Sequence, residues 1–90
     1  MEYQLYTVPR CDDCEAVKSF LDARGIQYTT LNLLLPEHKK IFGEIYFGID
    51  GKLKKTVQNK TVLPLLVEKN ESGGVERFAQ RSDDIKALFN

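Results

Sequence analysis

The sequence is poor in the features that mark membrane, secreted and nucleic-acid-binding proteins. No apolar run approaches the ~20 residues that a membrane-spanning helix needs, and the first residues lack the basic-then-apolar order of a signal peptide. We therefore expect a cytoplasmic protein that contacts no membrane. Thirteen basic residues balance thirteen acidic ones, so no net charge draws the chain toward nucleic acid, and we expect it to bind none.

Cysteine is also scarce, and the two cysteines present lie close together. Cys11 and Cys14 are separated by two residues, whereas small secreted scaffolds carry several cysteine pairs that lie far apart in the sequence. A zinc site needs four ligands, and His38 is the only histidine. The sequence therefore favours a reactive cysteine pair in a monomer without a bound metal or other cofactor. The alternative is a module that holds a metal or an iron–sulfur cluster between the cysteines of two chains.

The composition and the pattern of the first half predict a small α/β domain. The 90 residues, 42% of them apolar, suit a single domain of residues 1–90 with one core. β-Branched and aromatic residues at positions 3–8 predict a strand that ends at Pro9. An apolar helical repeat runs from Cys14 to about Arg24, with Gly25 as its C-terminal cap, and a second strand lies within residues 26–35. Strands joined by one helix pair in parallel through a right-handed crossover.

The second half predicts two more helices and a β-hairpin. A helix begins at Pro36, exposes His38 to solvent and ends near Gly48, and the lysine-rich residues 49–60 form a loop or an irregular hairpin. Residues 62–68 and 75–78 form two strands joined by a turn at 70–74. Ser82 caps a final helix that begins with two aspartates. The predicted order is βαβαββα, with a four-stranded mixed sheet flanked by helices.

The two cysteines lie where the first strand gives way to the first helix. Cys11 is thereby placed beside the unpaired amides and the positive end of the helix dipole, which both stabilise a thiolate relative to a thiol. Cys11 is the predicted nucleophile. Cys14, one helical turn further in, is expected to be more buried and to attack a mixed disulfide on Cys11, which releases the reduced partner. This arrangement predicts a thiol–disulfide oxidoreductase.

Three segments resemble the glutaredoxin family, and together they span nearly the whole chain. They are residues 6–14 with both cysteines, Thr61-Val62-Leu63-Pro64 before a strand, and Ser82-Asp83-Asp84-Ile85 at the start of the last helix. Residues 6–11 and 81–86 are similar in particular to the redoxins that donate electrons to ribonucleotide reductase. The resemblance implies a thioredoxin-like fold, a disulfide-containing protein substrate such as ribonucleotide reductase, and glutathione as electron donor, with thioredoxin reductase as the alternative donor.

The resemblance also assigns roles outside the cysteine pair. It implies a cis bond between Leu63 and Pro64 that faces Cys11, so that the backbone of Leu63 can pair with an incoming thiol-bearing peptide. Ser82 and Asp83 match positions that hold the glutamyl end of glutathione, through an amide at a helix N-terminus and a carboxylate. Their alternative role is helix capping.

Two departures from the family pattern affect substrate binding. A lysine that is frequent in the family three residues before the first cysteine is Val8 here, which leaves Arg10 as the nearest cation for substrate binding. The family's glycine pair before the last helix corresponds to Gln80 and Arg81. These larger side chains would narrow the glutathione groove or change its charge. The lysine-rich residues 49–60 exceed what a minimal glutaredoxin needs, and we interpret them as a solvated loop in preference to a docking surface.

A further departure lies between the cysteines, where Asp12 and Asp13 replace the usual Pro-Tyr. Carboxylates in the first helical turn stabilise the helix, because they interact favourably with its dipole. They also repel the negative charge of the Cys11 thiolate. If the repulsion dominates, the Cys11 thiolate is less stabilised and the protein becomes a stronger reductant. We then expect a potential nearer the thioredoxin value of about −270 mV than the glutaredoxin range of roughly −200 to −230 mV.

Overall fold

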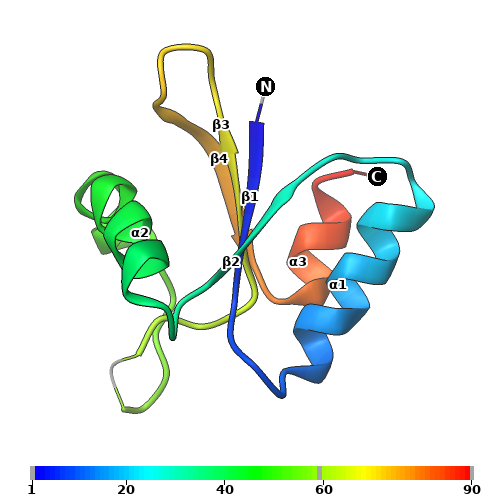
Figure 1. Ribbon diagram of the computed structural model, residues 1–90, viewed down its shortest axis with the longest axis horizontal. Coiled ribbons are helices and arrows are strands. Elements are labelled where there is room, and N and C mark those ends of the chain that lie inside the picture. The colour runs from blue at the N-terminus through cyan, green and yellow to red at the C-terminus, as the bar shows by residue number, and fades with distance from the viewer. Residues whose placement is uncertain (1, 59, 90) are drawn as a thin grey trace.

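Four strands form one mixed sheet in the order β2-β1-β3-β4 in the computed structural model, which describes residues 2–58 and 60–89 (Figure 1). β1 (Glu2–Thr7) pairs in parallel with β2 (Thr29–Asn32) and antiparallel with β3 (Leu65–Lys69). β4 (Val75–Gln80) adds to β3 as an antiparallel hairpin. The parallel first pair and the element order confirm the predicted topology.

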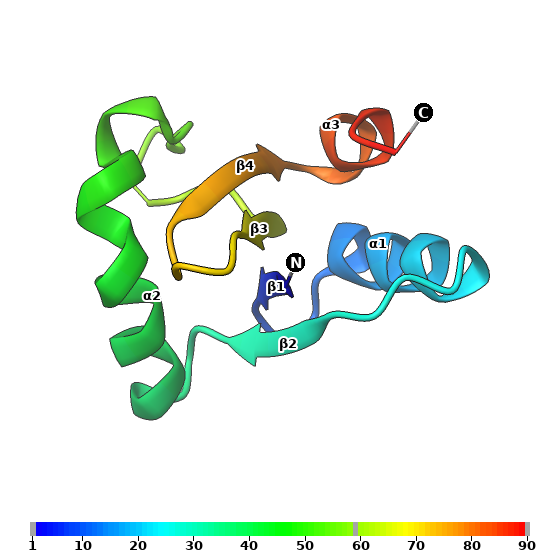
Figure 2. The same cartoon turned by 90° about the horizontal axis from the view of Figure 1, so that it is seen from above.

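The helices cover both faces of the sheet. α1 (Asp12–Ala23) and α3 (Ser82–Ala87) lie side by side on one face, and α2 (Pro36–Ile49) covers the other (Figures 1 and 2). Successive strand residues point to opposite faces, so each helical layer has its own buried cluster. The cluster under α1 and α3 consists of Leu5, Val17, Leu21, Leu66, Ala79 and Ile85. The cluster under α2 consists of Tyr6, Leu31, Ile45, Ile49, Leu53, Leu65 and Val67.

Element ends differ from the sequence prediction by a few residues. α1 begins at Asp12, two residues before the predicted start, and Gly25 follows it with a φ of 69°, the left-handed conformation that glycine adopts without a Cβ clash. β3 begins only at Leu65, after Pro64. α3 ends at Ala87, so the half-buried Leu88 and Phe89 pack against the core from beyond the helix.

An irregular hairpin, one of the two predicted alternatives for residues 49–60, begins only after residue 53, because Ile49 ends α2. A 3₁₀-helix, η1 (Asp50–Lys52), follows α2 and delivers Leu53 to the core. The chain then folds back on itself between residues 54 and 62, where the Val62 amide donates to the Lys54 carbonyl at 3.1 Å and the Thr56 amide donates to the Lys60 carbonyl at 2.7 Å. We call this segment the 54–62 hairpin.

The prediction that His38 faces solvent is wrong. Its side chain is half-buried, and its Nδ1 accepts a hydrogen bond of 2.8 Å from the Asn32 amide at the end of β2. The imidazole therefore satisfies a backbone donor at the point where the sheet hydrogen bonds stop. A periodicity argument does not detect this role, because the two residues belong to different elements.

A candidate dithiol active site

Cys11 is the N-terminal cap of α1. β1 ends at Thr7, and the chain turns through Pro9 and Arg10, which has a φ of 59°. The Cys11 backbone is extended, and its Sγ accepts a hydrogen bond of 3.0 Å from the Cys14 amide. The sulfur thus occupies the place that a serine or aspartate oxygen takes at a helix start. An amide that donates to Sγ stabilises negative charge there.

The two cysteines differ in how far they are accessible. Cys11 and Cys14 form a disulfide with a Cα–Cα distance of 5.2 Å. Cys14 is 2% exposed and lies on the buried face of α1, whereas Cys11 is only half-buried. A partner that approaches this end of the sheet therefore reaches the sulfur of Cys11 first.

A cavity of about 340 Å³, which we call the cysteine cavity, lies beside the disulfide. Both cysteines line it, and it receives two cations, Arg10 from the turn and Lys18 from α1. The Lys18 ammonium lies 3.5 Å from the Glu15 carboxylate. The sequence prediction named Arg10 alone. The signal that could have found Lys18 is its position four residues after Cys14, which places the two side chains on the same helix face.

The Leu63–Pro64 bond lies at the same end of the sheet as the cysteines. The antiparallel register pairs Tyr6 with Leu65, so the residues before Leu65 run alongside those that follow Tyr6. The bond is cis, as the resemblance implies. Leu63 and Val8 line one groove, and Val8 also lines the cysteine cavity. The sheet register therefore brings the Leu63–Pro64 pair next to the turn that carries Cys11.

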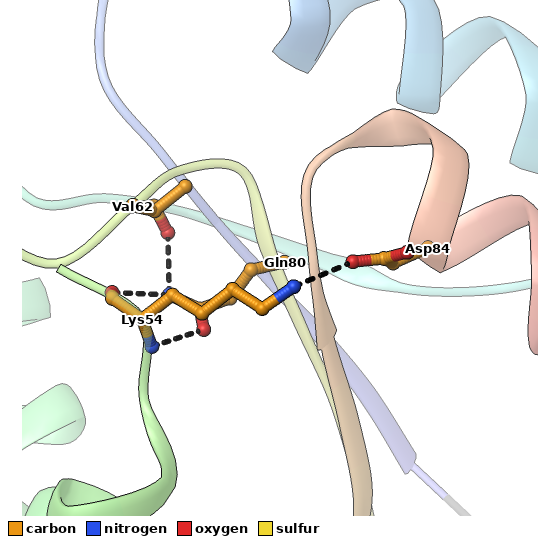
Figure 3. Close-up of polar contacts among 4 residues, drawn as sticks. All are labelled: Lys54, Val62, Gln80 and Asp84. Atoms are coloured by element: carbon orange, nitrogen blue, oxygen red, sulfur yellow. Dashed lines mark hydrogen bonds and ion pairs between the residues drawn. The ribbon is translucent and has the colours of Figure 1, made fainter. Parts of the chain in front are cut away.

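Gln80, at the end of β4, fixes the 54–62 hairpin that leads into Leu63 (Figure 3). Its side chain is 4% exposed. Its Oε1 accepts from the Lys54 amide at 2.7 Å, and its Nε2 donates to the carbonyls of Lys54 and Val62, each at 2.9 Å. The carboxamide thereby pairs with Lys54 as a backbone peptide group would. Sequence reasoning placed Gln80 in the glutathione groove, but its side chain is turned inward to the hairpin.

Arg81 connects the Leu63–Pro64 pair to α3. Its amide donates to the Pro64 carbonyl at 2.8 Å. Its φ of 72° and ψ of 156° lie in a region that is essentially reserved for glycine. The side chain is exposed, so it can add positive charge near this end of the molecule, as the sequence predicted.

The prediction that Ser82 caps α3 is wrong. The cap position is Arg81, where no side chain makes a capping hydrogen bond, and Ser82 is the first helical residue. The two aspartates do lie in the first turn of the helix. Asp84 forms an ion pair of 3.2 Å with the Lys54 ammonium, which ties the start of α3 to the 54–62 hairpin (Figure 3). Asp83 is exposed and makes no such pair among the described residues.

The side chains with shifted pKa values lie away from the cysteines. Burial raises the pKa of Tyr6, whose hydroxyl donates to Gln4 at 2.6 Å. A hydrogen bond from Arg77 lowers the pKa of the buried Glu68, which belongs to β3. Asp12 and Asp13 are both exposed at the start of α1. Solvent therefore screens their charges before they act on Cys11.

No group of three or more histidine, cysteine, aspartate or glutamate side chains is placed to hold a metal ion within residues 2–58 and 60–89. In the same part of the chain, no helix has the length and apolar character needed to cross a membrane.

Comparison with known proteins identifies the family. Residues 4–62, more than half of the chain, match the glutaredoxin family. This chain belongs to the glutaredoxin family. The crystal structure of a glutaredoxin from Archaeoglobus fulgidus is similar, with a TM-score of 0.64 and 17% sequence identity, and the match covers 99% of this chain and 86% of that one. No curated protein matches the sequence.

Membership of the glutaredoxin family, together with the Cys11–Cys14 disulfide, supports thiol–disulfide oxidoreductase activity. The likeness to the solved glutaredoxin extends the thioredoxin-like fold over the residues beyond 62, which carry Pro64, Ser82 and Asp83. The strained backbone of Arg81 agrees with its correspondence to a family glycine, because glycine adopts that conformation readily.

Proposed function

We propose that this glutaredoxin is a dithiol redoxin that reduces disulfides in protein substrates. The observation that carries the proposal is the placement of the Cys11 sulfur at the cap of α1, half-exposed and hydrogen-bonded to the Cys14 amide, with Cys14 buried beside it. A capping amide and the helix dipole favour the Cys11 thiolate. The burial of Cys14 keeps its sulfur away from a substrate disulfide, so that Cys11 attacks first.

The reaction is a two-electron exchange in two steps. The Cys11 thiolate attacks one sulfur of the substrate disulfide, forms a mixed disulfide and releases one substrate thiolate, which takes a proton from solvent. The Cys14 thiolate then attacks the Cys11 sulfur, which forms the Cys11–Cys14 disulfide and releases the second substrate thiolate. Leu63 and Pro64 align the substrate backbone beside Cys11, and Arg10 provides a cation for its binding. A bound metal takes no part in these steps.

Glutathione is the electron donor that we propose first. Ser82 and Asp83 are the residues we expect to hold its glutamyl end, and the inward side chain of Gln80 leaves that surface less crowded than the sequence implied. The exposed Arg81 adds a charge that most family members lack at this position, so thioredoxin reductase is the competing donor. Ribonucleotide reductase is the protein substrate that the resemblance favours, and we place the reaction in the cytoplasm.

The test uses oxidised protein and two reducing systems. We expect reduction by glutathione with glutathione reductase and NADPH, followed by reduction of insulin disulfides as a model protein substrate. Thioredoxin reductase with NADPH is tested in parallel. Reduction by the second system alone would transfer the donor assignment to thioredoxin reductase. Failure of reduced protein to act on any disulfide would contradict the proposed function itself.

A further inference from the structure

A groove of about 730 Å³ lies beside the cysteine turn, on the α2 side of the molecule. Its apolar lining comes from the turn after β1, the connection between β2 and α2, α2 itself and the residue that follows the 54–62 hairpin. These apolar residues are Val8, Leu33, Leu34, Phe42 and Leu63. Leu34 is 61% exposed. We call this hollow the apolar groove.

Local hydrogen bonds hold two walls of the apolar groove in place. In the wall between β2 and α2, the Asn32 side chain accepts from the Leu34 amide at 2.9 Å, while the Asn32 amide donates to His38. In the hairpin wall, the Lys60 amide donates to the Thr56 hydroxyl at 3.3 Å. The groove is therefore a preformed surface, and a ligand that enters it does not have to order its walls.

The apolar groove adjoins the active site. Val8 lines both the groove and the cysteine cavity. Leu63, which we expect to align the substrate backbone, also lines the groove. A peptide whose disulfide is at Cys11 would therefore extend from Leu63 along Val8 into the groove.

The charges around the apolar groove have one sign. Lys39 and Lys60 line it, both are exposed, and neither forms an ion pair within the described residues. Among the described residues that line it, none carries a carboxylate. By contrast, the cysteine cavity has carboxylates as well as cations. The groove thus combines an apolar floor with two cations that have no counter-charge, which is complementary to an acidic, apolar segment.

We propose that the apolar groove binds the segment of a protein substrate that adjoins its disulfide, and that this segment carries apolar side chains interspersed with carboxylates. The inference rests on the proposed function and adds to it the chemical class of substrate. Apolar side chains fill the space over Leu34 and Phe42, and carboxylates pair with Lys39 and Lys60. The lysine-rich hairpin then contributes one wall of a docking surface, in place of the solvated loop that the sequence favoured.

The test compares two peptides with the same internal disulfide. One has an extension of leucine and glutamate, the other an extension of leucine and lysine, and bis(2-hydroxyethyl) disulfide serves as a small substrate without an extension. We expect the KM of the acidic peptide to be lower than that of the basic peptide by about tenfold, because two exposed ion pairs of ordinary strength give about this factor. The values of kcat are expected to be similar, and added salt should reduce the difference.

Charge reversal locates the effect in the groove. The double variant Lys39→Glu with Lys60→Glu should raise the KM of the acidic peptide and lower that of the basic one, while the small disulfide is reduced at the parental rate. The matched control is Lys40→Glu with Lys52→Glu, which changes the net charge equally at two exposed lysines outside the groove lining. Leu34→Ser should raise the KM of both peptides, because it removes apolar contact and no charge.

Three outcomes would overturn the inference. Equal KM values for the two peptides would show that the groove does not select charge. An equal shift in the matched control would assign the effect to net charge instead of to the groove. Dimerisation that is lost in Leu34→Ser, measured by sedimentation, would make a second copy of this chain the occupant. Normal reduction of the small disulfide in any of these cases leaves the proposed function intact, whereas failure to reduce it contradicts both.

Discussion

The cysteine turn and the Leu63–Pro64 pair meet at one end of the sheet, but different contacts hold them. In the cysteine turn, the Cys14 amide donates to the Cys11 sulfur and the Glu15 amide donates to the Cys11 carbonyl, so partners are three or four residues apart. The segment that leads into Leu63 is held by Gln80, whose partners are 18 and 26 residues away. The chemistry is therefore encoded locally, whereas the alignment of the substrate depends on tertiary contacts.

This difference predicts that mutations can separate the two functions. Changes in the cysteine turn should alter the reaction steps and the redox potential while the stability of the fold changes little. Changes at the end of β4 and at the cap of α3 should alter stability or the KM for protein substrates while the cysteines keep their intrinsic reactivity. The variants below test this separation in order of expected effect.

The largest effect is expected from Cys11→Ser, which should abolish disulfide reduction because no mixed disulfide can form without the Cys11 thiolate. Cys14→Ser should instead trap the mixed disulfide, which mass spectrometry of the non-reduced adduct detects. Both variants should keep the thermal stability that the parent has in its reduced form. If Cys11→Ser formed the trapped adduct and Cys14→Ser reduced protein disulfides at the parental rate, the assigned roles would be reversed.

The second effect is expected from Gln80→Leu. It removes three hydrogen bonds, one of them in a buried position, and should lower the free energy of unfolding by about 1 to 3 kcal/mol. The KM for insulin disulfides should rise, because the hairpin no longer fixes the backbone before Leu63. Chemical denaturation and steady-state kinetics measure the two quantities.

The control for Gln80→Leu is Gln80→Glu, which keeps the acceptor for the Lys54 amide and loses both donors. It should also weaken the hairpin, since a carboxylate then faces two carbonyl oxygens. A parental KM in both variants would show that Gln80 supports the fold without positioning the substrate.

The third effect is expected from Arg81→Gly, which should increase the free energy of unfolding by about 1 kcal/mol. The φ and ψ of Arg81 cost a non-glycine residue of order 1 to 3 kcal/mol, and the greater freedom of glycine in the unfolded chain offsets roughly 0.5 to 1 kcal/mol of that gain. Arg81→Ala retains the strained backbone and removes the charge, so it separates the two contributions. No gain in stability for Arg81→Gly would indicate that the backbone at this position is relaxed.

The smallest effect is expected from replacing Asp12 and Asp13 with asparagine, because solvent screens both carboxylates. The double variant removes the repulsion of the Cys11 thiolate, so the thiolate absorbance should appear at lower pH. The reduced form is then favoured, and the potential should become slightly less negative. Equilibration in a glutathione redox buffer measures it. An unchanged potential would show that these aspartates act only on the helix.

Much of the fold could be predicted because it depends on patterns that repeat over short distances. Successive side chains of β1 and β3 point alternately to the two buried clusters. The apolar repeat of α1 continues from Cys14 to Leu21. The cis bond before Pro64 was reached through the family resemblance and not from the residues themselves. Local patterns did not distinguish a loop from a hairpin in residues 49–60, since the bonds that form the hairpin join residues in irregular structure.

The errors have two physical causes. His38 was expected to face solvent and Gln80 to crowd the groove, but each side chain bonds to a residue of another segment. Ser82 was expected to cap α3, but the backbone conformation of Arg81 places the cap one residue earlier. The Asn32 amide at the end of β2 needs an acceptor, and His38 provides it. Arg81 takes the cap position of α3 because its backbone also bonds to Pro64.

The sequence by itself determined the chemistry of this protein. Two cysteines one helical turn apart, placed between a strand and a helix, form a dithiol whose first sulfur caps the helix, and this needs only bonds between neighbouring residues. Only the tertiary structure decided what surrounds that dithiol. The sheet register brings Leu63 beside Val8, Gln80 reaches the 54–62 hairpin, and four separate segments enclose the apolar groove. Such contacts arise only when the buried clusters have assembled, because it is their packing that brings distant segments within hydrogen-bonding distance.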